Sequence, residues 1–148
     1  MIIRPFSEND AQEISRLIST CLTEVISKEY DERAIGCVRE EYTPEGIVEK
    51  ANKSVMIVAE AGDRVVGTAR LEGDTIFTVY VDPAMHRNRI GSKLMDEVEA
   101  FARRQGHIAV RVEAFTSSKG FYARRGYEKV RVIGIEGFGT IVEMRKAL

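Results

Sequence analysis

Apolar and polar residues alternate along this chain with two periods, one typical of helices and one typical of strands. Residues 2–5 predict a short first strand, and Ser7 and Asp10 can cap the helix that follows it. A capping hydroxyl at Thr43, followed by a proline, predicts the start of a second helix that ends near Asn52. The apolar face of the first helix consists of Ile14, Leu17, Ile18, Cys21, Leu22 and Val25.

The middle of the chain has the shorter period of strands. Residues 54–60 and 64–71 predict two strands joined by a Gly-Asp hairpin turn. Residues 75–81, TIFTVYV, predict a strand that is buried on both faces. The less periodic residues 29–42 are expected to form a mobile helix or loop.

A long amphipathic helix is expected over residues 90–106, where the final glycine ends it. The strand at 108–114 is reached through this helix, so it should run parallel to the strand at 75–81. This is the only parallel crossover that the pattern predicts. A dinucleotide-binding Rossmann fold, which requires repeated crossovers, is therefore not expected.

The C-terminal part predicts a short helix over residues 118–125 and then a hairpin of strands at 127–132 and 138–145. The complete order of elements indicates an α/β (α+β) protein. Its expected core is a mixed, mostly antiparallel seven-stranded sheet, with one parallel β-α-β crossover and helices on both faces.

Composition indicates a single domain over residues 1–148 and excludes several classes of partner. The net charge is −1 and the pI about 6.2, so no basic surface favours nucleic acid or an anionic membrane. No apolar run reaches the roughly 20 residues that span a bilayer, and the first residues lack a signal peptide. A cytoplasmic location, with Cys21 and Cys37 reduced, is expected, and a disulfide between the two is the alternative. His86 and His107 stand apart from the cysteines, so no metal site is predicted.

A basic segment joins the strand at 75–81 to the long helix. Its sequence, HRNRIGS over residues 86–92, adds the charges of Arg87 and Arg89 to the unpaired N–H groups and the positive dipole of a helix start. Such a segment favours a phosphate or pyrophosphate. An ordinary solvated turn is the alternative.

Two motifs in this half of the chain resemble those of the GNAT superfamily of N-acetyltransferases. The first is VDPAMHRNRIGSKLM at residues 81–95, and the second is FYARRGY at residues 121–127. The order of elements resembles that family over the whole chain. The resemblance implies an acyltransferase that uses acetyl-CoA as cosubstrate, without a metal, to acetylate a primary amine by direct attack on the thioester.

The resemblance also implies where acetyl-CoA binds. The strand at 75–81 would separate from the strand at 108–114, and its backbone groups would pair with the pantetheine amides. The start of the long helix would hold the pyrophosphate. His86 stands where the family usually has Arg or Gln, Arg89 stands where it has glycine, and Phe115 stands where a polar contact is common. The implied cofactor-binding residues are Val79, Tyr80, Val81, His86, Arg87, Asn88, Arg89, Ile90, Gly91 and Ser92.

The resemblance places Tyr122 as the general acid that protonates the leaving thiolate, since a phenol with a pKa near 10 can donate to it. Glu113 is the preferred general base, because its strand should border the gap. Glu72 and Asp74 are the alternatives. Asp74 lies five residues before Val79, which is roughly 17 Å along an extended strand.

The acceptor is not specified by any motif. The first two helices and residues 132–138 are expected to line its pocket, with Tyr30, Tyr42 and Phe138 as candidates. A small-molecule amine and a protein amine both remain open, and an exposed C-terminal strand would allow a homodimer. The changes at His86 and Arg89 also favour an alternative, a non-catalytic acyl-CoA-binding sensor or interaction module.

Overall fold

The protein, described here from a computed structural model of residues 1–148, is built on one seven-stranded sheet. The strand order is β1-β2-β3-β4-β5-β7-β6. Only the β4–β5 pair is parallel, as predicted from the crossover, and every other pair is antiparallel. The strands are β1 (Ile2–Pro5), β2 (Val55–Ala61), β3 (Arg64–Glu72), β4 (Thr75–Val81), β5 (Ala109–Phe115), β6 (Glu128–Ile135) and β7 (Gly139–Ala147).

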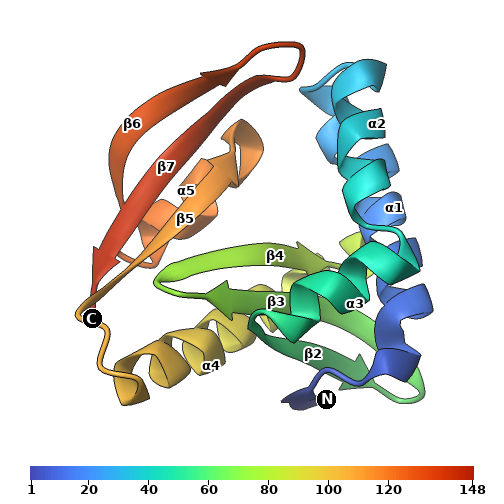
Figure 1. Cartoon of the computed structure of the whole chain (residues 1–148), viewed down its shortest axis with the longest axis vertical. Helices are drawn as coiled ribbons and strands as arrows, with labels where there is room; N and C mark the ends of the chain where they lie inside the picture. Colours follow the sequence, from blue (N-terminus) through green and yellow to red (C-terminus); the bar gives the residue numbers. More distant parts are fainter.

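Helices cover both faces of the sheet, and each face has its own hydrophobic cluster (Figure 1). Three helices pack on one face through residues such as Ile14 and Ile47, and two pack on the other through residues such as Leu94 and Tyr122. The predicted fold class is therefore confirmed. The helices are α1 (Ala11–Glu24), α2 (Glu32–Glu41), α3 (Pro44–Asn52), α4 (Ile90–Arg104) and α5 (Lys119–Arg124).

The region at residues 29–42, for which a mobile helix or a loop was expected, contains the regular helix α2. The carboxylate of Asp31 accepts a hydrogen bond from the N–H of Ala34 and caps the helix start. Ile35 and Val38 are buried against the first cluster. The few apolar residues of this helix are therefore enough to hold it on the sheet.

Strand β4 starts beside β5 and then separates from it. The parallel ladder contains only the pairs Thr75–Arg111 and Ile76–Val112. Beyond Ile76 the two strands diverge, which leaves one side of β4 without a neighbouring strand (Figure 1). The expectation of a strand buried on both faces was therefore only partly right, because Val79 and Val81 are half-buried.

A β-bulge marks the point of separation. The register between β3 and β4 shifts by one residue between Thr68 and Arg70, opposite Thr78. Thr78 has a φ of 59°, in the left-handed region that a β-branched residue rarely adopts. Its hydroxyl lies 3.0 Å from the hydroxyl of Tyr42 and accepts a hydrogen bond of 2.9 Å from Nε of Arg70. These two contacts hold the strained residue from both sides.

A buried carboxylate connects α4 to the C-terminal part of the sheet. Glu99 is 2% exposed and accepts hydrogen bonds from Tyr127 (2.7 Å), Lys146 (2.8 Å) and Arg125 (3.2 Å). Tyr127 in turn packs its ring against that of Tyr122, at 5.5 Å between centroids. Glu99 thus fixes the aromatic support behind Tyr122.

Replacing Glu99 with alanine should leave the buried partners of its carboxylate unpaired. We expect the free energy of unfolding to fall by about 3 kcal/mol, which corresponds to a drop in Tm of roughly 6–12 °C. Thermal unfolding followed by circular dichroism measures this. The control is Glu97→Ala on the exposed side of the same helix; equal Tm values for the two variants would contradict the assigned role of Glu99.

Candidate active site

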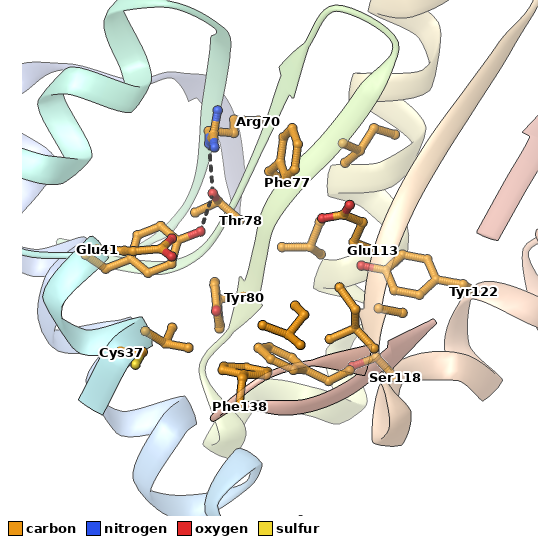
Figure 2. Close-up of a pocket in the computed structure, with 18 of the residues that line it drawn as sticks. Cys37, Glu41, Arg70, Phe77, Thr78, Tyr80, Glu113, Ser118, Tyr122 and Phe138 are labelled. Carbon is orange, nitrogen blue, oxygen red and sulfur yellow. Dashed lines mark hydrogen bonds between the residues drawn. The ribbon is translucent and has the colours of Figure 1, made fainter. Parts of the chain in front are cut away.

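A cavity of about 450 Å³ lies where β4 and β5 have separated. Its walls come from α2, β4, β5, α5 and the turn between β6 and β7 (Figure 2). The lining is mainly apolar and aromatic, with a small number of polar groups that converge on the interior. This is the usual character of a small-molecule site.

Tyr122 projects from α5 into this cavity and is 6% exposed. Its ring is held edge-on by Phe121 at 5.1 Å and by Tyr127 at 5.5 Å. The hydroxyl has no hydrogen-bond partner in the protein, yet it is not completely enclosed. Burial raises the pKa of Tyr122, so its phenol stays protonated at neutral pH. The cavity therefore contains an unused neutral proton donor.

Glu113 reaches the same cavity from β5. Figure 2 shows its carboxylate above the space into which the Tyr122 hydroxyl points. Glu113 takes part in no ion pair or side-chain hydrogen bond. By contrast, Glu72 pairs with Arg70 at 2.7 Å and Asp74 pairs with Arg111 at 3.3 Å, and neither lines the cavity.

The backbone of β4 directs polar groups toward the gap. The N–H of Asp82 donates to the carbonyl of Val66 on β3. Because successive residues of a strand turn their backbone groups to opposite sides, those of Val79 and Val81 face away from β3, where β5 is no longer paired. Tyr80 is 8% exposed and packs its ring against Tyr42.

The carbonyl of Val81 already has two partners. Nε2 of His86 lies 3.1 Å from it, and Sγ of Cys21 donates to it over 3.2 Å. Burial raises the pKa of Cys21 to about 12, which keeps this thiol protonated. An added strand-like ligand would have to share or displace one of these contacts.

The basic segment lies outside the cavity, at the far end of β4. Residues Pro83–Asn88 form a 3-10 helix, η3, and α4 begins at Ile90, the residue at which the long helix was expected to start. The first α-helical bond in α4 joins the N–H of Lys93 to the carbonyl of Arg89. The N–H groups of residues 90–92 therefore remain without helical partners. Arg87, Asn88 and Arg89 are exposed around them.

Of the expected acceptor residues, Tyr42 and Phe138 line the cavity, whereas Tyr30 lies behind it. The Tyr30 ring packs on Phe115 at 5.3 Å and on Phe138 at 5.2 Å. Arg70 and Thr78 also line the cavity, and neither was predicted from the sequence as a site residue. Arg70 is the one charged residue of β3 between the strand ends Arg64 and Glu72, and this was the available signal.

A model of the acetyltransferase (GNAT) domain matches residues 15–148. Together with the cavity beside a separated β4, this match places the protein in the class of acetyl-CoA-dependent acyltransferases. The chain belongs to the GNAT acetyltransferase family, as its motifs predicted. A comparison with curated protein sequences gave no match.

Solved structures share the fold over nearly the whole chain. A GCN5-related N-acetyltransferase from Rhodopseudomonas palustris has 23% identity and a TM-score of 0.89, covering 99% of this chain and 95% of that one. The PaiA N-acetyltransferase from Thermoplasma acidophilum, in complex with coenzyme A, has 20% identity and a TM-score of 0.82, covering 99% and 98%. An aminoglycoside 6'-N-acetyltransferase from Enterococcus faecium has 16% identity and a TM-score of 0.74, covering 99% and 97%.

No three or more His, Cys, Asp or Glu side chains come together as a potential metal site. None of the helices has the length and apolar character required to cross a membrane.

Arg89 keeps a left-handed backbone (φ 56°, ψ 26°) at the position where the motif usually has glycine. Replacing it with glycine should relieve this strain and raise the free energy of unfolding by about 0.5–1 kcal/mol. The expected gain in Tm is about 1–4 °C. Arg87→Gly is the matched control in η3, where glycine should lower Tm instead. A loss of Tm in both variants would refute this account of the segment.

Proposed function

We propose that the chain is a single N-acetyltransferase domain that transfers the acetyl group of acetyl-CoA to a primary amine. The observation that carries this proposal is one cavity that brings together an unpartnered phenol, Tyr122, and an unpaired carboxylate, Glu113. It lies beside backbone groups of β4 that have no neighbouring strand. The coenzyme A complex of the PaiA neighbour, which shares this fold, supports the same ligand here.

The residues of β4 and the start of α4 fit the two ends of such a ligand. The outward-facing backbone groups of Val79 and Val81, with Tyr80 between them, would pair with the pantetheine amides. The segment His86, Arg87, Asn88, Arg89, Ile90, Gly91 and Ser92, whose first four residues are exposed, would hold the pyrophosphate with N–H groups and positive charge. When bound, acetyl-CoA supplies an activated acyl group as a thioester.

Tyr122 and Glu113 then divide the proton transfers between them. The amine nitrogen forms the new bond to the carbonyl carbon while the carbon–sulfur bond breaks. Glu113, directly or through a water molecule, takes the proton that the amine loses. Tyr122 gives a proton to the departing thiolate, and its raised pKa keeps it protonated until the thiolate forms.

The volume of the cavity, about 450 Å³, favours a small amine over an extended polypeptide. Tyr30 donates a hydrogen bond to the carbonyl of Thr140 on β7, and Glu29 accepts from Thr116 and Ser117 after β5. These bonds tie the segment before α2 to both strands that border the cavity. A protein acceptor would have to insert the end of its chain into the cavity.

A non-catalytic acyl-CoA-binding module is the second candidate. His86 and Arg89 favour it, because they alter the motif that positions the cofactor, and Nε2 of His86 lies 3.1 Å from the Val81 carbonyl. Calorimetry with acetyl-CoA, followed by thiol release over a broad panel of primary amines, separates the two functions. Binding without thiol release from any amine would favour the module and reject the transferase.

The variant Tyr122→Phe tests the proposed general acid. Removing only the hydroxyl should lower turnover about 100-fold and leave the affinity for acetyl-CoA nearly unchanged. Initial rates of thiol release and calorimetric titration measure the two quantities. Tyr127→Phe, which removes a hydroxyl outside the cavity, should lower Tm but retain most of the rate. Equal rates for Tyr122→Phe and the unaltered protein would remove Tyr122 from the mechanism.

A further inference from the structure

Three strands place an arginine, an aromatic ring and a carboxylate in one row on the cavity side of the sheet. Arg70 on β3 is paired in register with Phe77 on β4. On the other side of β4, Ile76 is paired with Val112, so Glu113 follows at the level of Phe77. All three side chains line the cavity, and Figure 2 shows Phe77 between the other two. Because β4 and β5 diverge just beyond Ile76, the space between Arg70 and Glu113 is part of the cavity rather than continuous sheet.

The guanidinium of Arg70 is buried but incompletely paired. The residue is 5% exposed. Its Nε donates to Thr78, its Nη1 donates to Glu72 at 2.7 Å, and the group lies 4.7 Å from the centre of the Phe77 ring. Nη2 has no partner in the protein, and it is not fully enclosed, since Arg125 Nε is the only completely buried side-chain nitrogen without a partner.

A buried guanidinium whose Nη2 has no partner in the protein favours a ligand that completes its hydrogen bonds. Arginine presents its donors in a planar fork that matches a carboxylate. The other charged groups of the lining are Arg33, Glu41 and Glu136, and all three are exposed to solvent. Screening by water and salt weakens their influence on a ligand relative to that of Arg70.

We propose that the acceptor is a short amine that also carries a carboxylate, as in a small amino acid. Its carboxylate binds Nη2 of Arg70, its carbon chain lies over Phe77, and its amine faces Glu113. Arg70 is then a specificity-determining residue. This inference rests on the proposed acetyltransferase function and goes beyond it by naming the class of acceptor.

The test compares matched pairs of acceptors that differ only in the carboxylate: glycine with glycinamide, β-alanine with β-alaninamide, and 4-aminobutyrate with its amide. Thiol release gives kcat and KM for each. We expect at least one carboxylate to have a KM at least 10-fold lower than that of its amide. If the amides are acetylated as well as the carboxylates, the inference fails while the proposed function stands. If no primary amine releases thiol, the proposed function itself fails.

Variants of Arg70 and of its ion-pair partner Glu72 test whether Arg70 causes the preference for a carboxylate. Arg70→Gln should raise the KM of the preferred carboxylate about 10- to 100-fold more than it raises the KM of its amide. Glu72→Gln removes the competing carboxylate and should lower the same KM, and this variant keeps the Arg70–Thr78 contact if Arg70→Gln does not fold. Arg103→Gln, at an exposed position on α4, is the control for loss of a positive charge. An unchanged KM in both Arg70→Gln and Glu72→Gln, or an equal effect on acid and amide, would overturn the assignment.

Discussion

The interruption of the sheet between β4 and β5 is the constraint on which the other features depend. It begins at Thr78, whose left-handed backbone is held by Tyr42 from the α2 side and by Arg70 from β3. Backbone strain of this kind persists only where neighbouring groups over-determine it. The same three residues line the cavity that the interruption creates. The hydrogen bonds that join Tyr42, Thr78 and Arg70 therefore both hold the sheet open and shape the cavity.

The architecture could be predicted because it follows from local patterns. Alternating apolar residues defined the strands, and the helix between Val81 and Ala109 required one parallel pair. The motif around Tyr122 also indicated the family, which its domain model confirms. The details of the cavity could not be predicted in this way. Thr78 belongs to an ordinary strand-forming run, and its conformation arises only from distant partners. The role of Arg70 likewise depends on Phe77 and Glu113, which come from other strands.

Burial has different effects on the titratable groups around the cavity. It raises the pKa of Tyr122, for which no compensating hydrogen bond exists, and so preserves a neutral phenol. Glu99 is still more deeply buried, but two cationic side chains and a phenol surround it. The phenol of Tyr122 is therefore free to donate a proton, whereas the carboxylate of Glu99 holds its structural partners in place. Tyr127 joins them, because it binds Glu99 and packs against Tyr122.

The bonds of Glu29 and Tyr30 have a consequence for how the site admits ligands. Glu29 holds the segment after β5, and Tyr30 holds both that segment and β7, through Thr116 and Thr140. Neither residue can move outward alone, because each is joined to the same short stretch of chain. Separating Glu29 and Tyr30 from β5 and β7 would break all of these bonds together. Phe115 and Phe138, which line the cavity and pack on the Tyr30 ring, are therefore held in place by the same set of bonds.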